Sequence, residues 1–162
     1  LEPLMYGGSG IDSLSHTMPE MVPERYESGS RNIQAVAGLN AALKWILEQG
    51  IESIYQKEKE YTTKLVDIIK GYSNIKLVGY KDDESNIGVV SCLFDGYSSD
   101  NIGQVLNEKE IAVRSGLHCS PIAHEFFGTS PEGTVRFSIG YFNTDEDLEK
   151  LQKALDYIEL NG

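Results

Sequence analysis

From about residue 32 onward, apolar positions along the chain follow helix and strand periods in turn. Apolar residues three and four positions apart predict a helix that begins near Asn32 and stops at Gly50, and a second helix over residues 51–70. A continuous apolar run over residues 87–94 is typical of a buried central strand. Shorter runs predict three further strands, over residues 75–78, 111–113 and 134–139.

Two later helices carry capping signals. Ser98 or Ser99 can cap a helix that follows the central strand. Thr144, with Asp147 three residues on, resembles a capping box. The last helix has one apolar stripe, formed by Leu148, Leu151, Leu155 and Ile158. The order helix, helix, strand, strand, helix, strand, loop, strand, helix predicts an α/β (α+β) domain, with a small mixed sheet and helices packed on one face.

Residues 1–31 have a different character. They are rich in Gly, Ser and Pro and show no sustained helical period, so they cannot bury much apolar surface alone. We expect an arm that packs against protein outside this chain; a mobile arm is the alternative. Leu1 opens without a start methionine or a leader, which indicates a piece of a longer protein. The predicted division is therefore an arm over residues 1–31 and a domain over residues 32–162.

Composition narrows the possible partners. The net charge of -11 argues against non-specific binding to nucleic acid, whose phosphates require clustered lysine and arginine. The longest apolar runs are shorter than a membrane span, so no membrane segment is predicted. Two cysteines are too few for a disulfide framework, and a reducing cytoplasm is the natural setting.

The loop over residues 114–133 carries the candidate chemistry. Cys119 follows a predicted strand end, where reactive side chains are often held. His118 and Arg114 lie close to it in sequence, and positive neighbours favour the nucleophilic thiolate. A zinc site formed by His118, Cys119 and His124 is an alternative, although it lacks a fourth ligand. Cys92 lies inside the apolar strand and is expected to be a small buried residue.

Several motifs, in order along the chain, resemble one known family. They are GGSG (7–10), PERYESGSRN (23–32), RSGLHC (114–119), GTVRFS (133–138) and YFNTDED (141–147). Together they resemble the C-terminal region of cysteine desulfurases, which are class V aminotransferases in the branch related to selenocysteine lyases. The resemblance implies the small C-terminal domain of a fold-type I enzyme, preceded by a segment of the large domain. Such an enzyme uses pyridoxal phosphate to convert L-cysteine to L-alanine.

The resemblance also implies roles for individual residues. Cys119 stands where the family's thiol takes up sulfur as a persulfide, which then passes to a sulfur-acceptor protein, as in iron–sulfur cluster assembly. Arg136 matches the arginine that binds the substrate carboxylate, and Arg114 and His118 complete the predicted substrate-binding set. For Arg114, a supporting ion-pair role is the alternative. Ser30 replaces the family's usual threonine, which reaches the cofactor phosphate of the partner subunit in a homodimer. Gly29 beside it would let the backbone approach closely.

Besides Ser30, this sequence departs from the family pattern at two positions near the thiol. Leu117 stands where the branch often has a second histidine, and Ser120 where it has alanine. Both changes leave the thiol in place and could alter its reactivity or its acceptor. The family's cofactor lysine follows a Ser-x-His sequence, and no His-Lys pair occurs in the 162 residues. We therefore expect that lysine upstream of Leu1, and no turnover of cysteine by this chain alone.

Two other functions stay open from the sequence. One is a related class V aminotransferase or lyase in which Cys119 has no catalytic role. The other is a non-enzymatic domain that relays a persulfide or binds a partner. The motifs do not distinguish cysteine from selenocysteine as substrate, nor do they identify the sulfur acceptor.

Overall fold

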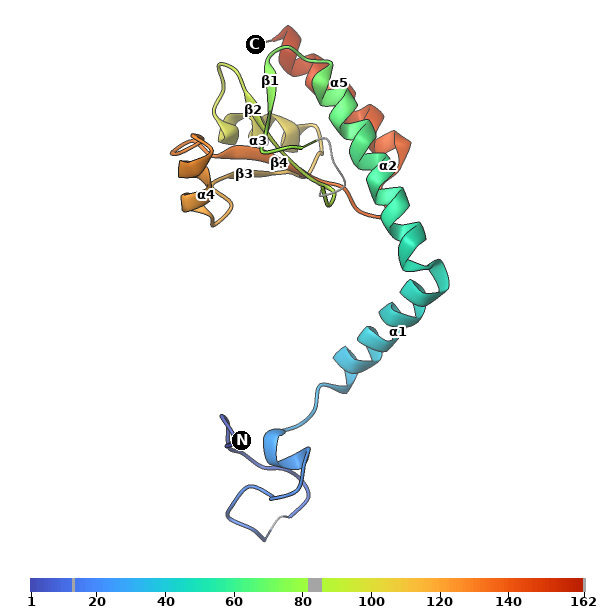
Figure 1. Cartoon of the computed structure of the whole chain (residues 1–162), viewed down its shortest axis with the longest axis vertical. Helices are drawn as coiled ribbons and strands as arrows, with labels where there is room; N and C mark the ends of the chain where they lie inside the picture. Colours follow the sequence, from blue (N-terminus) through green and yellow to red (C-terminus); the bar gives the residue numbers. More distant parts are fainter. Residues whose placement is uncertain (13, 82–85, 162) are drawn as a thin grey trace. The chain divides into compact units, whose positions relative to one another are not determined.

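The computed structural model describes residues 1–12, 14–81 and 86–161. The chain forms two units, Leu1–Gln49 and Gly50–Gly162 (Figure 1). The division falls after the first long helix, so this helix groups with the arm predicted over residues 1–31. The assignment of that arm to a cofactor-binding large domain stays a prediction.

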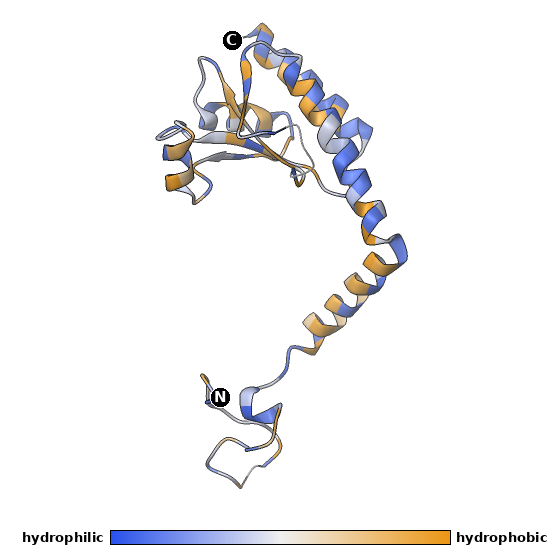
Figure 2. Ribbon diagram, viewed as in Figure 1, coloured by the Kyte–Doolittle hydropathy of each residue, from blue (hydrophilic) through white to orange (hydrophobic). Residues whose placement is uncertain are grey.

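The N-terminal unit contains an irregular arm and one long helix. The arm holds a short 3-10 helix, η1 (Glu24–Tyr26), and precedes α1 (Ile33–Gln49), which was predicted from the apolar period. Asn32 caps α1, because its side-chain oxygen accepts the N–H of Ala35 at 2.9 Å. No residue of α1 is buried by the described parts of the chain, and Figure 2 shows apolar residues along its length. Within the described residues, most of the apolar face of α1 therefore stays uncovered.

The C-terminal unit consists of a sheet with helices. Its elements are α2 (Ile51–Lys70), β1 (Ile75–Val78), β2 (Val89–Phe94), α3 (Ser99–Glu108), β3 (Arg114–Gly116), α4 (Pro121–Phe126), β4 (Thr134–Ser138) and α5 (Asp145–Leu160). The predicted α/β class is confirmed. The strand order is β1-β2-β4-β3, and all three pairs are antiparallel rather than mixed. β4 inserts between β2 and β3, so these two strands never pair with each other.

The hydrophobic core lies on one face of this sheet. Val90, Cys92 and Phe94 alternate with more exposed neighbours along β2, so one side of the strand is buried. Helices α2, α3 and α5 cover that face, as predicted. Their buried residues join those of β2 and β4 in one cluster, which includes Leu65, Ile69, Ile102, Leu106, Leu148, Leu151, Leu155, Ile158, Val135 and Phe137. The opposite face of the sheet carries the alternate residues of each strand.

Two parts of the predicted element list are wrong. The strand predicted over residues 111–113 is displaced to Arg114–Gly116, because the N–H of Ile111 donates to the Leu106 carbonyl at 2.9 Å at the end of α3. Ile111 and Val113 instead pack, half-buried, against the core cluster. The predicted loop contains α4, which has proline at its first helical position.

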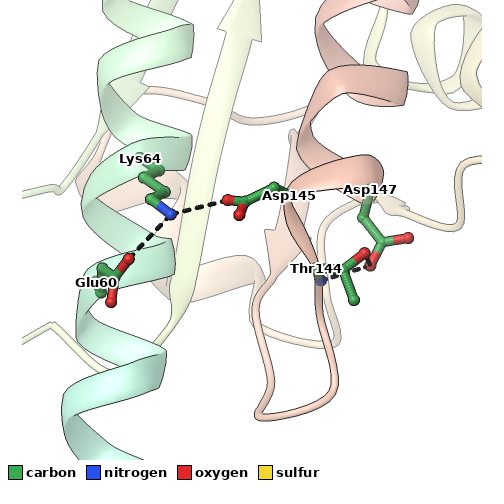
Figure 3. A network of polar contacts seen from close by, with 5 residues as sticks. All are labelled: Glu60, Lys64, Thr144, Asp145 and Asp147. Carbon is green, nitrogen blue, oxygen red and sulfur yellow. Dashed lines mark hydrogen bonds and ion pairs between the residues drawn. The ribbon is translucent and has the colours of Figure 1, made fainter.

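The start of α5 is tied to α2 by a polar network (Figure 3). The Asp147 carboxylate accepts the N–H of Thr144 at 2.9 Å, which confirms the predicted capping box and lowers the pKa of Asp147. Lys64 of α2 lies 2.9 Å from Glu60 and 2.8 Å from Asp145. Acidic residues in the first turn of α5 also suit the positive end of the helix dipole.

None of the helices in the described ranges combines the length and the apolar character that crossing a bilayer requires.

Replacing Gly133 by alanine should disrupt the connection between β3 and β4. A Cβ at Gly133 would overlap the carbonyl group of Gly116, and the backbone there has φ +72°. We expect Gly133→Ala to lower the free energy of unfolding by about 2–4 kcal/mol, measured by chemical denaturation. Gly96→Ala is the matched control, because Gly96 has φ +85° and a Cβ there meets nothing within 4 Å. Equal losses for the two variants would contradict the close approach.

Candidate active site

The pairing of β3 with β4 brings two arginines together. Arg114 lies directly opposite Arg136, and Ser91 of β2 lies opposite Arg136 on its other side. Directly opposed residues in an antiparallel pair share a face, and Arg136 lies between the core residues Val135 and Phe137 along β4. Both guanidinium groups therefore belong to the face of the sheet away from the core. Like charges directly opposite one another are unfavourable, so this pair favours a bound anion.

The predicted nucleophile lies on a tight turn just after β3. The N–H of Ser120 donates to the Leu117 carbonyl at 2.8 Å, which closes a turn with His118 and Cys119 at its centre. Both central residues have positive φ, 52° at His118 and 60° at Cys119. This backbone region is rare for residues other than glycine. The turn leaves Cys119 exposed.

Arg114 is the cation in contact with the thiol. Its Nη2 lies 3.1 Å from Sγ of Cys119. A guanidinium that donates to sulfur stabilises the sulfur when it carries negative charge. β3 and the turn that follows it therefore hold the thiol and its counter-charge five residues apart in the chain.

The side chain of His118 makes its hydrogen bond with Thr134 of β4. Its Nε2 lies 2.9 Å from Oγ1 of Thr134, and its Nδ1 is buried without a partner among the described residues. Burial lowers the pKa of His118, and the nearby charges of Arg136, His124 and Arg114 lower it further. The imidazole is therefore neutral at neutral pH. Positive charge at Cys119 comes from Arg114 and not from the adjacent histidine.

The second histidine of the segment supports α4. His124 is buried, and its Nδ1 lies 2.7 Å from Oγ1 of Thr129. Its ring centroid lies 5.4 Å from that of His118. Across the described ranges, no three histidine, cysteine, aspartate or glutamate side chains are grouped so that they could hold a metal ion. The alternative zinc site therefore has no support in the geometry.

The sequence also made predictions for Cys92, Ser30 and Gly29, which lie away from the thiol turn. Cys92 is fully buried, as predicted, and burial raises the pKa of its thiol to about 12. Ser30 and Gly29 lie in the N-terminal unit, where both are exposed. Gly29 has φ +85° and donates its N–H to the Gly8 carbonyl at 2.8 Å. The Ser30 hydroxyl is thus presented next to a turn whose backbone is held in place.

Sequence reasoning missed the role of Thr134 in this site. It is 1% exposed and lies opposite Gly116, two residues before Arg136 on β4. Its position in GTVRFS gives no signal of a contact with His118, which lies 16 residues earlier. Only the β3–β4 register brings the two side chains together.

The chain is similar to known proteins over almost its whole length. The aminotransferase class-V family model matches residues 1–151. A cysteine desulfurase of Synechococcus elongatus is 34% identical over 159 residues, which are 97% of this chain and 25% of that protein. The solved structure of a cysteine desulfurase from Escherichia coli is similar with a TM-score of 0.81 and 26% identity, over 98% of this chain and 39% of that one.

A second solved structure gives the same result. The cysteine desulfurase of Thermococcus onnurineus NA1 matches with a TM-score of 0.79 and 28% identity, over 96% of this chain and 39% of that one. The chain therefore spans between a quarter and two fifths of the length of these proteins.

Removing the Arg114 guanidinium should slow the reaction of Cys119 with alkylating agents. We expect Arg114→Gln to reduce the rate of iodoacetamide alkylation at pH 7 by about tenfold, because the thiolate loses a charge-assisted hydrogen bond. Mass spectrometry can follow modification of Cys119 itself. Arg136→Gln is the matched control, since it removes the opposite guanidinium without removing the sulfur contact. A larger effect at Arg136 than at Arg114 would contradict this assignment.

Proposed function

The chain belongs to the aminotransferase class-V family, and from that premise we propose that it is the C-terminal part of a pyridoxal-phosphate-dependent cysteine desulfurase. The observation that carries the proposal is the exposed Cys119 thiol at 3.1 Å from Arg114, with Arg136 directly opposite Arg114 on the next strand. A nucleophile that contacts one guanidinium, with a second guanidinium opposite the first, suits an amino acid whose carboxylate is anionic and whose sulfur can be transferred. The cysteine desulfurases that the chain resembles support this choice of substrate.

Arg136 is proposed to bind the carboxylate of L-cysteine. A guanidinium forms paired hydrogen bonds with a carboxylate and so sets the direction of the amino acid. The bound carboxylate would also relieve the repulsion between Arg136 and Arg114. Because the two arginines are held by strand pairing, the substrate is oriented by the rigid part of the fold and not by a loop.

Cys119 is proposed to receive the substrate sulfur. Its thiolate attacks the sulfur, so an S–S bond forms while the substrate C–S bond breaks. The electron pair of that bond stays with the amino-acid carbon, which takes up a proton and leaves as L-alanine. Arg114 stabilises the attacking thiolate, and the product is a persulfide on Cys119. Pyridoxal phosphate supplies the electron sink that makes this carbon a leaving group.

Ser30 is a fitting group for that cofactor. The exposed Ser30 hydroxyl can donate to a phosphate oxygen, and Gly29 at φ +85° leaves room for close approach. We propose that Ser30 serves the cofactor of the partner subunit in a homodimer, and that residues 1–31 belong to the large domain. The anchoring lysine and the other cofactor contacts are then expected from the rest of the protein.

The persulfide is proposed to leave through a sulfur-acceptor protein. Cys119 is exposed on a tight turn, so an outside thiol can reach it. This would take place in the cytoplasm, where thiols are kept reduced. A class V aminotransferase or lyase without a catalytic cysteine gives no reason for the guanidinium contact at Sγ, and the desulfurase reaction is favoured over it for this reason.

Replacing Cys119 should abolish sulfur transfer in the full-length protein. We expect Cys119→Ala to reduce alanine formation from L-cysteine by at least about a thousandfold, because the proposed sulfur acceptor is removed. The absorbance of the bound cofactor should be unchanged. Cys92→Ala is the matched control, since Cys92 is buried and should not affect turnover beyond its effect on stability. Wild-type alanine production by Cys119→Ala would show that sulfur removal does not pass through Cys119.

Replacing Arg136 by lysine should weaken substrate binding through the carboxylate. Lysine keeps the charge but loses the paired hydrogen bonds, so we expect KM for L-cysteine to rise by about tenfold or more. Cysteamine, which lacks the carboxylate, is the matched comparison in steady-state kinetics. Its KM should change little between the wild type and Arg136→Lys. An equal rise for both substrates would argue against carboxylate recognition by Arg136.

A further inference from the structure

The turn that presents the thiol is held in an unfavourable backbone conformation. His118 and Cys119 both have positive φ, and each such residue costs about 1–2 kcal/mol relative to glycine. Turns of this kind normally use Asn-Gly or Gly at the central positions. Backbone strain of this kind persists only where surrounding contacts hold it. The contacts around His118 and Cys119 therefore determine whether the thiol stays where it is.

One of these contacts comes from the strand that carries Arg136. Thr134 is 1% exposed, and its hydroxyl oxygen lies 2.9 Å from Nε2 of His118. Thr134 and Arg136 are two residues apart on β4, so their side chains share a face of the sheet. The same strand thus contacts both the residue before the nucleophile and the place proposed for the substrate carboxylate.

The other contacts to the turn do not reach the His118 ring in the way that the Thr134 hydroxyl does. Arg114 reaches the sulfur itself, and the close approach of Gly133 to Gly116 positions the start of the turn. The Nδ1 atom of His118 has no partner among the described residues, so Thr134 provides the hydrogen bond that orients the ring. Without the hydroxyl, the ring would keep only its hydrogen bond to the Thr134 backbone, and Nδ1 would still be buried without a partner among the described residues, which is costly. The ring would then turn toward solvent and release the turn.

We propose that Thr134 is a positioning residue for sulfur transfer: its hydroxyl orients the His118 ring and thereby holds the Cys119 thiol on Arg114, in register with Arg136. This inference rests on the proposed function for its role in turnover, but the placement of the thiol can be measured without cofactor or substrate. Neither the motifs nor the comparisons assign a role to Thr134.

The test compares Thr134→Val, which keeps the shape of the side chain, with Thr134→Ser, which keeps the hydroxyl. The full-length protein without cofactor is treated with iodoacetamide at pH 7, and modification of Cys119 is followed by mass spectrometry. We expect about fivefold to tenfold slower alkylation in Thr134→Val and a rate within about twofold of the wild type in Thr134→Ser. In the loaded enzyme, Thr134→Val should lower kcat for alanine formation and leave KM for L-cysteine unchanged.

If one variant is unstable, a double-mutant cycle of Thr134 and His118, measured by the alkylation rate of Cys119, still tests the inference. His118→Ala should slow alkylation as much as Thr134→Val, and the double variant should be no slower than either, because both act through one contact. Additive losses, or equal losses in Thr134→Val and Thr134→Ser, would overturn the positioning role. Slower alkylation together with normal desulfuration by Cys119→Ala would leave Thr134 in its role and remove the proposed function instead.

Discussion

The antiparallel pairing of β3 with β4 is the contact on which the rest of the site depends. It sets Arg114 opposite Arg136 and Gly116 opposite Thr134, although β3 has only three residues. A shift of one residue would move every side chain of β3 to the other face of the sheet. The cations, the thiol turn and its anchoring threonine would then no longer lie together. The close approach of Gly133 to Gly116 allows this register, since no larger residue fits there.

The hydrophobic core fixes the position of β4, the strand with which the short strand β3 pairs. β4 lies between β2 and β3, and its residues Val135 and Phe137 are buried under the helices. Burial of one set of alternate residues forces the other set, Thr134 and Arg136, to the opposite face. Hydrophobic burial on one side of β4 thus determines which polar groups reach the candidate active site on the other side. Stability and chemistry use the two faces of one strand.

Arg114 and His118 have different roles at the thiol: Arg114 supplies positive charge, and His118 supplies position. Arg114 contacts the sulfur, while His118 is kept neutral by burial and by the surrounding cations. A guanidinium keeps its charge at any physiological pH, so it is a constant partner for a thiolate. A neutral imidazole costs less to bury than a charged one and can serve as a structural link. The result is a thiol with a permanent counter-charge and a neighbour that provides position.

Much of the molecule followed from the sequence alone. Periodicity predicted α2 and α5, the burial of Cys92 and the capping box at Thr144, because these depend on residues close in the chain. Motifs indicated the family, and the roles they imply for Cys119, Arg114 and Arg136 stay proposals. The antiparallel sheet, the displacement of β3, the presence of α4 and the contact between His118 and Thr134 came only from the tertiary structure. Strand order and register join residues far apart in sequence, and local patterns carry no information about which strand inserts between two others.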